Sequence, residues 1–241
     1  MMRKPSALLL ALLTLLSLCA CGGMNAPTAT PTAKPASPTV APTQPASGDT
    51  KTTDEPTAGE APSDAPSSGT SILVVYFSRT GEQYTVGVID EGNTAIVAKM
   101  IAEKTGADLY EILPETDYPY TYAELTDVAK KEQNEKARPA IRDELPDLAQ
   151  YDTIFIGAPV WWGDWPMILY TFFESAELSG KNLVPFSTHE GSGLSGFDKK
   201  LASAVPDATV LTGQAFRGND CQNKQESVSD TVDKWLSGLG L

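Results

Sequence analysis

Hydroxyl and amide side chains accompany glycine in two segments near the start of the apolar part of the chain. Ser78-Arg79-Thr80-Gly81 follows the apolar run 71–77, and Gly92-Asn93-Thr94 precedes the apolar segment that begins at Ala95. Hydroxyl groups and free backbone amides at a helix N-terminus suit a phosphate dianion, and glycine lets the backbone approach it. We interpret these segments as a phosphate site. An ordinary strand–helix turn with a capping side chain is the alternative.

Three tryptophans fall within five residues of one another. They belong to the segment Gly-Ala-Pro-Val-Trp-Trp-Gly-Asp-Trp-Pro at 157–166, as Trp161, Trp162 and Trp165. Aromatic rings supply a flat wall for a planar heterocycle. Packing of the rings into the core or onto a partner is the alternative for each one, but the cluster favours contact with a ligand.

A third polar segment, Ser-Thr-His-Glu-Gly-Ser-Gly at 187–193, offers hydroxyl and backbone groups for the polar edge of such a ring. It contains His189, the only histidine of the chain. A single histidine is more often a structural hydrogen-bonding group than a catalyst, so we predict no catalytic residue. No His, Cys or Glu spacing typical of a zinc site is present.

Short apolar runs alternate with helical patterns along residues 71–241. Strands are expected at 71–77, 108–113, 153–157, 182–187 and 209–211, and helices at 95–102, 122–136, 166–174, 197–204 and 225–239. This alternation predicts βαβ units and a doubly wound α/β sheet. In such sheets ligands bind beyond the carboxyl ends of the strands, where the three polar or aromatic segments would meet.

Taken together, the three segments resemble the flavodoxin family, over essentially all of 71–241. The resemblance implies a five-stranded parallel sheet of order 2-1-3-4-5 that binds FMN. The residues it assigns to FMN are Ser78, Arg79, Thr80, Gly81, Asn93, Thr94, Pro159, Val160, Trp161, Trp162, Gly163, Thr188, His189, Glu190, Gly191 and Gly193. Arg79 would add positive charge or point to solvent, and the backbone near Gly163 would hydrogen-bond the ring.

One segment departs from the family pattern. Residues 82–92 interrupt a phosphate loop that is continuous in the family. The insertion could bulge outward and leave Thr80 beside Asn93. It could instead fold over the site and bring Gln83 or Tyr84 to the ligand.

The N-terminus has the features of a bacterial lipoprotein signal. Positive charge at Arg3 and Lys4 precedes an apolar run of about a dozen residues, which is too short to span a bilayer. Leu18-Cys19-Ala20-Cys21 resembles a lipobox, which implies a signal peptide over 1–20 and lipidation of Cys21. Residues 21–70 are rich in Pro, Thr and Ala and predict a disordered tether. We therefore expect a lipid-anchored domain on the extracytoplasmic face of the membrane.

The net charge of the chain is −13. Residues 71–241 hold 14 basic and 26 acidic residues, a net charge of −12. This field repels nucleic acid and anionic lipid and would favour a basic protein partner, although acidity also promotes solubility.

These features predict a membrane-tethered FMN protein that transfers electrons between redox partners. Two alternatives stay open from the sequence. One is an NAD(P)H-dependent FMN reductase that acts on quinones or other small acceptors. The other is a non-catalytic surface-binding lipoprotein, since a fold alone does not fix a function.

Overall fold

The computed structural model describes residues 71–241. The predicted signal peptide 1–20, the lipidation site Cys21 and the tether 21–70 lie outside the described residues. Within 71–241, no helix is both long enough and apolar enough to cross a membrane.

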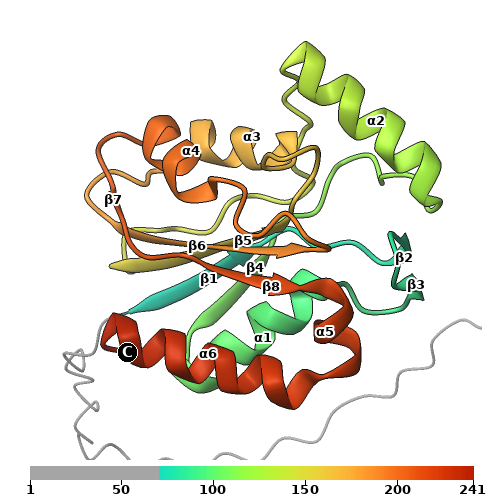
Figure 1. The fold of residues 1–241 in the computed structure, drawn as a ribbon. Coiled ribbons are helices and arrows are strands. Elements are labelled where there is room, and N and C mark those ends of the chain that lie inside the picture. The colour runs from blue at the N-terminus through green and yellow to red at the C-terminus, as the bar shows by residue number, and fades with distance from the viewer. Residues whose placement is uncertain (1–70) are drawn as a thin grey trace, which may run out of the picture. The chain divides into compact units, whose positions relative to one another are not determined.

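A parallel sheet forms the centre of the domain (Figure 1). Its strands are β1 (Ile72–Tyr76), β4 (Asp108–Glu111), β5 (Thr153–Pro159), β6 (Asn182–His189) and β7 (Thr209–Val210). They are ordered β4-β1-β5-β6-β7, and every pair is parallel. This confirms the predicted order 2-1-3-4-5, because β4 is the second predicted strand and the others follow in turn.

The sheet has six strands instead of the predicted five, because the predicted fifth strand forms only part of the sheet edge next to β6. A sixth strand, β8 (Gln214–Arg217), pairs with the last residues of β6, whereas β7 pairs with the first two. The interruption lies opposite Pro185, which has no N–H to donate. A Cβ on Gly213 would approach the carbonyl oxygen of Pro185 to 2.6 Å, so the chain passes this point without a side chain.

Each face of the sheet carries its own apolar core. Along β1, alternate residues enter different clusters: Val74 and Tyr76 one, Leu73 and Val75 the other. Helices α1 (Asn93–Thr105) and α6 (Gln225–Leu239) cover the first face, and α3 (Met167–Ser175) and α4 (Phe197–Ala204) the second (Figure 1). Coverage on both sides explains why the strands appear as continuous apolar runs.

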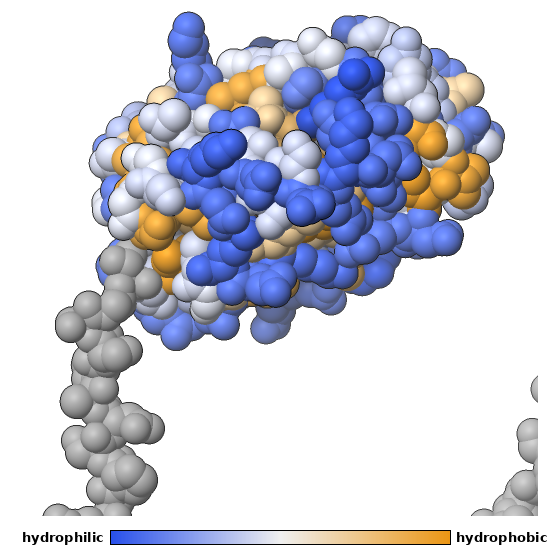
Figure 2. All heavy atoms as spheres, turned by 60° about the horizontal axis from the view of Figure 1, so that its bottom comes forward, coloured by the Kyte–Doolittle hydropathy of each residue, from blue (hydrophilic) through white to orange (hydrophobic). Residues whose placement is uncertain are grey.

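The outward surface of the α1 and α6 layer is largely hydrophilic, as Figure 2 shows. Helix α6 turns Val228, Val232, Trp235 and Leu236 inward and leaves its charged residues outside. This is the amphipathic pattern of a helix that packs on one side only.

Three further elements lie at the periphery. Helix α2 (Tyr122–Glu135) buries only Leu125 and Ala129. The insertion forms an antiparallel hairpin of β2 (Gly81–Gln83) and β3 (Gly87–Ile89). Helix α5 (Gly218–Asn223) was not expected from the sequence, because its six polar or small residues have no apolar periodicity.

Candidate functional site

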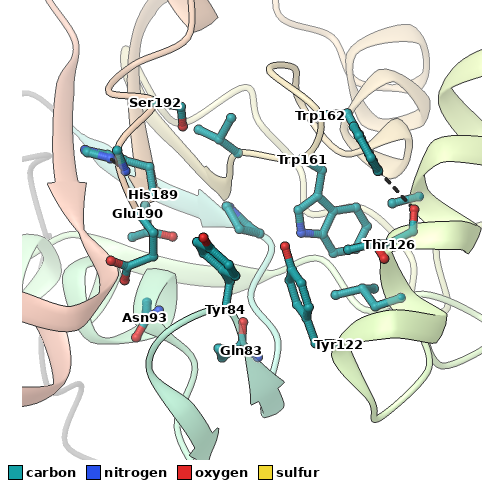
Figure 3. Close-up of a pocket in the computed structure, with 16 residues that line it drawn as sticks. Gln83, Tyr84, Asn93, Tyr122, Thr126, Trp161, Trp162, His189, Glu190 and Ser192 are labelled. Carbon is teal, nitrogen blue, oxygen red and sulfur yellow. Dashed lines mark hydrogen bonds between the residues drawn. The ribbon is translucent and has the colours of Figure 1, made fainter.

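A cavity of about 580 Å³ opens at the carboxyl ends of β5 and β6 (Figure 3). Four parts of the chain surround it: the hairpin, the start of α1, one face of α2, and the loops after β5 and β6. The lining residues are Gln83, Tyr84, Asn93, Tyr122, Leu125, Thr126, Ala129, Pro159, Val160, Trp161, Trp162, Thr188, His189, Glu190, Gly191 and Ser192. The cavity therefore lies where a doubly wound sheet places its ligands.

Aromatic rings form one side of the cavity (Figure 3). Trp161 packs edge-on against Phe77 and Tyr118, with ring centroids 5.3 and 4.9 Å apart. Tyr84 of the hairpin stacks on Tyr122 of α2 at 5.6 Å. These contacts hold flat apolar surfaces beside the cavity, as a planar heterocycle requires.

Trp162 occupies a strained position in a tight turn. The backbones of Trp161 and Asp164 exchange hydrogen bonds of 3.0 and 2.9 Å, and Trp162 and Gly163 have φ values of 50° and 72°. These values describe a type I′ turn, in which positive φ is costly for a bulky residue. The Trp162 side chain is held by α2, because its Nε1 donates to the Thr126 carbonyl at 3.0 Å.

Trp165 does not belong to the cavity wall, which corrects the expectation for the tryptophan cluster. Its side chain is 1% exposed and stacks on Phe197 at 3.6 Å. Gly163, which was expected to meet the ring, does not line the cavity either. Its carbonyl oxygen accepts a hydrogen bond from Nζ of Lys200. The core alternative thus holds for one tryptophan of the three.

The two halves of the interrupted loop lie in direct contact. A Cβ on Gly92 would approach Ser78 Oγ to 2.1 Å and the Arg79 backbone to 2.8 Å. The insertion therefore bulges outward, and it also brings Gln83 and Tyr84 to the cavity. The outward bulge agrees with the first interpretation, but Thr80 lines a different cavity from Asn93; contact of Gln83 or Tyr84 with a ligand stays a prediction.

The N-terminus of α1 has partly free amides. Ser78 Oγ accepts from the amide of Ala95 at 3.1 Å, whereas the amides of Asn93 and Thr94 have no acceptor within residues 71–241. Asn93 lines the cavity. The helix N-terminus can therefore hold an anion there through backbone groups.

Several predicted phosphate ligands have other partners. The Thr94 hydroxyl is buried and lies 2.8 Å from the Thr188 hydroxyl, which joins α1 to β6. The Arg79 guanidinium donates to the carbonyls of Glu82 and Pro119 at 2.7 and 2.6 Å, and also to that of Tyr120. Arg79 therefore fastens the loop to the chain before α2 and does not simply point to solvent.

The residues predicted to bind FMN fall into three groups according to which cavity they line. Ser78, Arg79 and Thr80 line a second cavity, of about 510 Å³. Neither cavity is lined by Gly81, Thr94, Gly163 or Gly193. The nine other predicted residues line the first cavity together: Asn93, Pro159, Val160, Trp161, Trp162, Thr188, His189, Glu190 and Gly191.

Two ionisable side chains, at the end of β6 and at the start of the loop after it, have fixed hydrogen-bond partners. Nδ1 of His189 accepts from the amide of Gly191 at 2.9 Å, and burial lowers the pKa of the imidazole. His189 is therefore neutral at pH 7, with its proton on Nε2. The Glu190 carboxylate accepts from the amide of Asn219 at 2.6 Å and from Nε of Arg217 at 3.1 Å.

Some features of the site were missed from the sequence. Tyr122, Leu125, Thr126 and Ala129 line the cavity from one face of α2, and their helical spacing was the available signal. The glycines at 191, 193 and 196 also have the spacing GxGxxG after a strand. All three adopt positive φ, of 142°, 61° and 71°, so the turn itself accounts for them.

The site thus combines an aromatic slot with a polar end, which suits a planar ring that carries a phosphate. None of its 16 lining residues is Lys or Arg. Within residues 71–241, no group of three or more His, Cys, Asp or Glu side chains is placed to hold a metal ion.

Comparisons with known proteins agree with this arrangement. A family model described as flavodoxin matches residues 71–236. No curated protein sequence matches the chain.

Solved structures of similar proteins include two described as flavoproteins from Bacteroides. The one from Bacteroides eggerthii is 29% identical, with a TM-score of 0.58 over 72% of this chain and 99% of its own. The one from Bacteroides uniformis is 33% identical, with a TM-score of 0.53 over 68% and 99%. A flavoprotein from Lactobacillus acidophilus, solved in complex with FMN, is 22% identical, with a TM-score of 0.51 over 66% and 99%, and shows the shared fold.

Proposed function

Because the chain belongs to the flavodoxin family, we propose that its domain binds FMN in the cavity between α2 and the loops after β5 and β6. We further propose that the protein transfers electrons between redox partners while anchored to the membrane at Cys21. The observation that carries the binding proposal is that one cavity is lined both by aromatic rings and by Asn93, whose backbone amide has no acceptor within residues 71–241.

The cavity fits FMN both in its volume and in the arrangement of its aromatic and polar groups. Its volume of about 580 Å³ lies within the roughly 300–1,000 Å³ typical of cofactor sites. Trp161 and the Tyr84–Tyr122 pair would flank the ring, and the amide of Asn93 at the start of α1 would hold the phosphate. Hydroxyl and backbone groups of residues 188–192 would meet the polar edge.

FMN, when bound, supplies one- and two-electron chemistry. The role of the protein is to orient the ring and to set its surroundings. Trp162, held to Thr126, and Trp161, held between Phe77 and Tyr118, fix the apolar wall. No described lining side chain is cationic, so the site disfavours added negative charge on the ring.

The first test is the absorbance spectrum of purified residues 71–241. The two Bacteroides structures are covered over 99% of their length by 72% and 68% of this chain, which is about the length of residues 71–241 and supports the use of this domain alone. We expect a yellow protein with one FMN per domain. A colourless protein that takes up no added FMN would exclude the proposal.

A second experiment distinguishes an electron carrier from a reductase. Stopped-flow mixing of the FMN-loaded domain with NADH or NADPH is expected to bleach the flavin slowly, while an artificial reductant bleaches it rapidly. Rapid bleaching by either nucleotide would favour the reductase instead.

The anchor is tested in the bacterial cell with the full chain. The wild type is expected in the membrane fraction with incorporated labelled palmitate. Cys21→Ser should abolish both, and Cys19→Ser serves as the matched control that should abolish neither. Equal behaviour of the two variants would contradict lipidation at Cys21.

A further inference from the structure

Helix α5 places one amide side chain against the predicted phosphate end of the cavity. Gln222 Nε2 lies 2.8 Å from the carbonyl oxygen of Glu91 and 2.8 Å from Oδ1 of Asn93. Both contacts come from the same nitrogen, and both cross more than a hundred residues of sequence. The two acceptors flank Gly92, at the second half of the interrupted loop.

Hydrogen-bond chemistry fixes the direction of both amides. A backbone carbonyl only accepts, so the Gln222 atom that faces Glu91 must be the NH₂ group. The Asn93 atom that shares this donor must then be its oxygen. Asn93 is therefore prevented from turning its carbonyl oxygen toward an anion, and its Nδ2 remains as the donor.

Asn93 lines the cavity, and its side-chain nitrogen lies beside the backbone of Gly218. A Cβ on Gly218 would approach Asn93 Nδ2 to 2.4 Å, so the glycine leaves space for this group. Figure 3 shows Asn93 and Glu190 on the same side of the cavity, across from Trp161 and Trp162. The Glu190 carboxylate beside it is compensated by Arg217 and by the Asn219 amide.

Those same bonds anchor α5. The Asn219 amide donates to Glu190 at 2.6 Å, and Cys221 is fully buried against the α1 and α6 layer. Gln222 is thus carried on a fixed support and not on a free chain end. A fixed donor holds its partner in one orientation at little entropic cost.

We infer that Gln222 is a positioning residue that keeps the Asn93 amide nitrogen directed at the phosphate of FMN and so helps the site to prefer FMN over riboflavin. This inference rests on the proposed FMN function. Riboflavin shares the ring but lacks the phosphate, so the two ligands separate a phosphate effect from an effect on the fold or the ring.

The test is the affinity of residues 71–241 for FMN and for riboflavin in the Gln222→Glu variant. A carboxylate cannot donate to Glu91 or to Asn93, so Asn93 is expected to turn its nitrogen away from the cavity. FMN affinity should fall about tenfold, the effect of losing one hydrogen bond to a charged group. Riboflavin affinity should change by less than about twofold.

One control tests the effect of an added negative charge, and a second tests whether Gln222 acts through Asn93. Gln225→Glu makes the same chemical change at an exposed site three residues away and should leave the FMN preference intact. In an Asn93→Ala background, Gln222→Glu should lose most of its effect on FMN, because the group through which it acts is gone.

Equal losses for FMN and riboflavin would overturn the inference, because they indicate a general structural role. An undiminished loss of FMN affinity in the Asn93→Ala background would also overturn it. A wild-type domain that binds neither flavin would instead overturn the proposed function itself.

Discussion

Trp161 and Trp162 are adjacent in sequence but hold the cavity wall in different ways. Trp161 is wedged among the rings of Phe77 and Tyr118, whereas Trp162 is half-exposed and held by α2 through Thr126 and through Lys130, whose Nζ lies 4.9 Å above its ring. The strained φ of Trp162 persists because these contacts fix it. The two residues should therefore respond differently to substitution.

We predict that Trp161→Leu lowers the affinity for FMN and for riboflavin together, by about tenfold, because it removes the flat wall and leaves the phosphate end unchanged. Fluorescence titration with both flavins measures this. Trp165→Phe is the matched control, since its ring lies in the core and its loss should lower stability with little effect on affinity. A loss confined to FMN would contradict the assigned role of Trp161.

Glu132 allows a prediction about pH. Burial raises the pKa of its carboxyl group above the ordinary value of 4.5, although a 3.0 Å hydrogen bond from Tyr118 partly opposes this. The folded state then holds the proton at pH values where the unfolded state has lost it. The free energy of unfolding therefore falls, through this group, as pH rises above about 4.5.

Glu132→Gln is expected to remove the fall in the free energy of unfolding that Glu132 causes as pH rises. The variant should therefore gain stability relative to wild type between about pH 5 and pH 8. Urea denaturation at several pH values measures the difference. Glu135→Gln, at an exposed position of the same helix, is the control for the loss of one negative charge. A stability difference between Glu132→Gln and wild type that does not change with pH would contradict the argument.

At the scale of elements, the interrupted loop depends on close contact between its halves. We predict that Gly92→Ala lowers the free energy of unfolding by about 1–3 kcal/mol and weakens FMN binding, because its Cβ would collide with Ser78 and Arg79. Gly238→Ala in α6 meets open space and should be neutral or slightly stabilising. Thermal denaturation and FMN titration of both variants test this, and wild-type behaviour of Gly92→Ala would contradict it.

The same contrast between elements shows what could be predicted from the sequence. Buried strands such as β1 and β5 can be predicted from their continuous apolar runs. The positions of the loops after them then follow from the strand order. Helix α5 and the split edge of β7 and β8 could not be predicted, because polar contacts and Pro185 decide them. Two of the three carbonyl partners of Arg79, those of Pro119 and Tyr120, lie about forty residues away, so its role in fastening the loop to the chain before α2 has no local signal.

The site residues show the same limit. Residue types identified the loop after β6 and two of the three tryptophans. They could not show that Thr94 faces Thr188 or that Trp165 enters the core, because a hydroxyl or an indole serves either purpose. Only the packing of elements that are distant in sequence decides whether such a side chain lines the cavity or contacts the rest of the protein.

At the scale of the whole molecule, negative charge opposes an anionic ligand. The domain carries a net charge of −12, and no Lys or Arg lines the cavity. We predict that FMN affinity increases as salt rises from about 0.05 to 0.5 M, because screening weakens the repulsion of the phosphate. Riboflavin, measured in the same series, should show little change. A fall in FMN affinity with salt would indicate a cationic phosphate site.

The central claim is that FMN occupies the cavity between α2 and the loops after β5 and β6. A crystal structure of residues 71–241 grown with FMN tests it most directly. We predict the ring against Trp161 and the phosphate at the amide of Asn93, at the start of α1. A phosphate in the second cavity, beside Thr80, or a ring outside the aromatic slot would contradict the account.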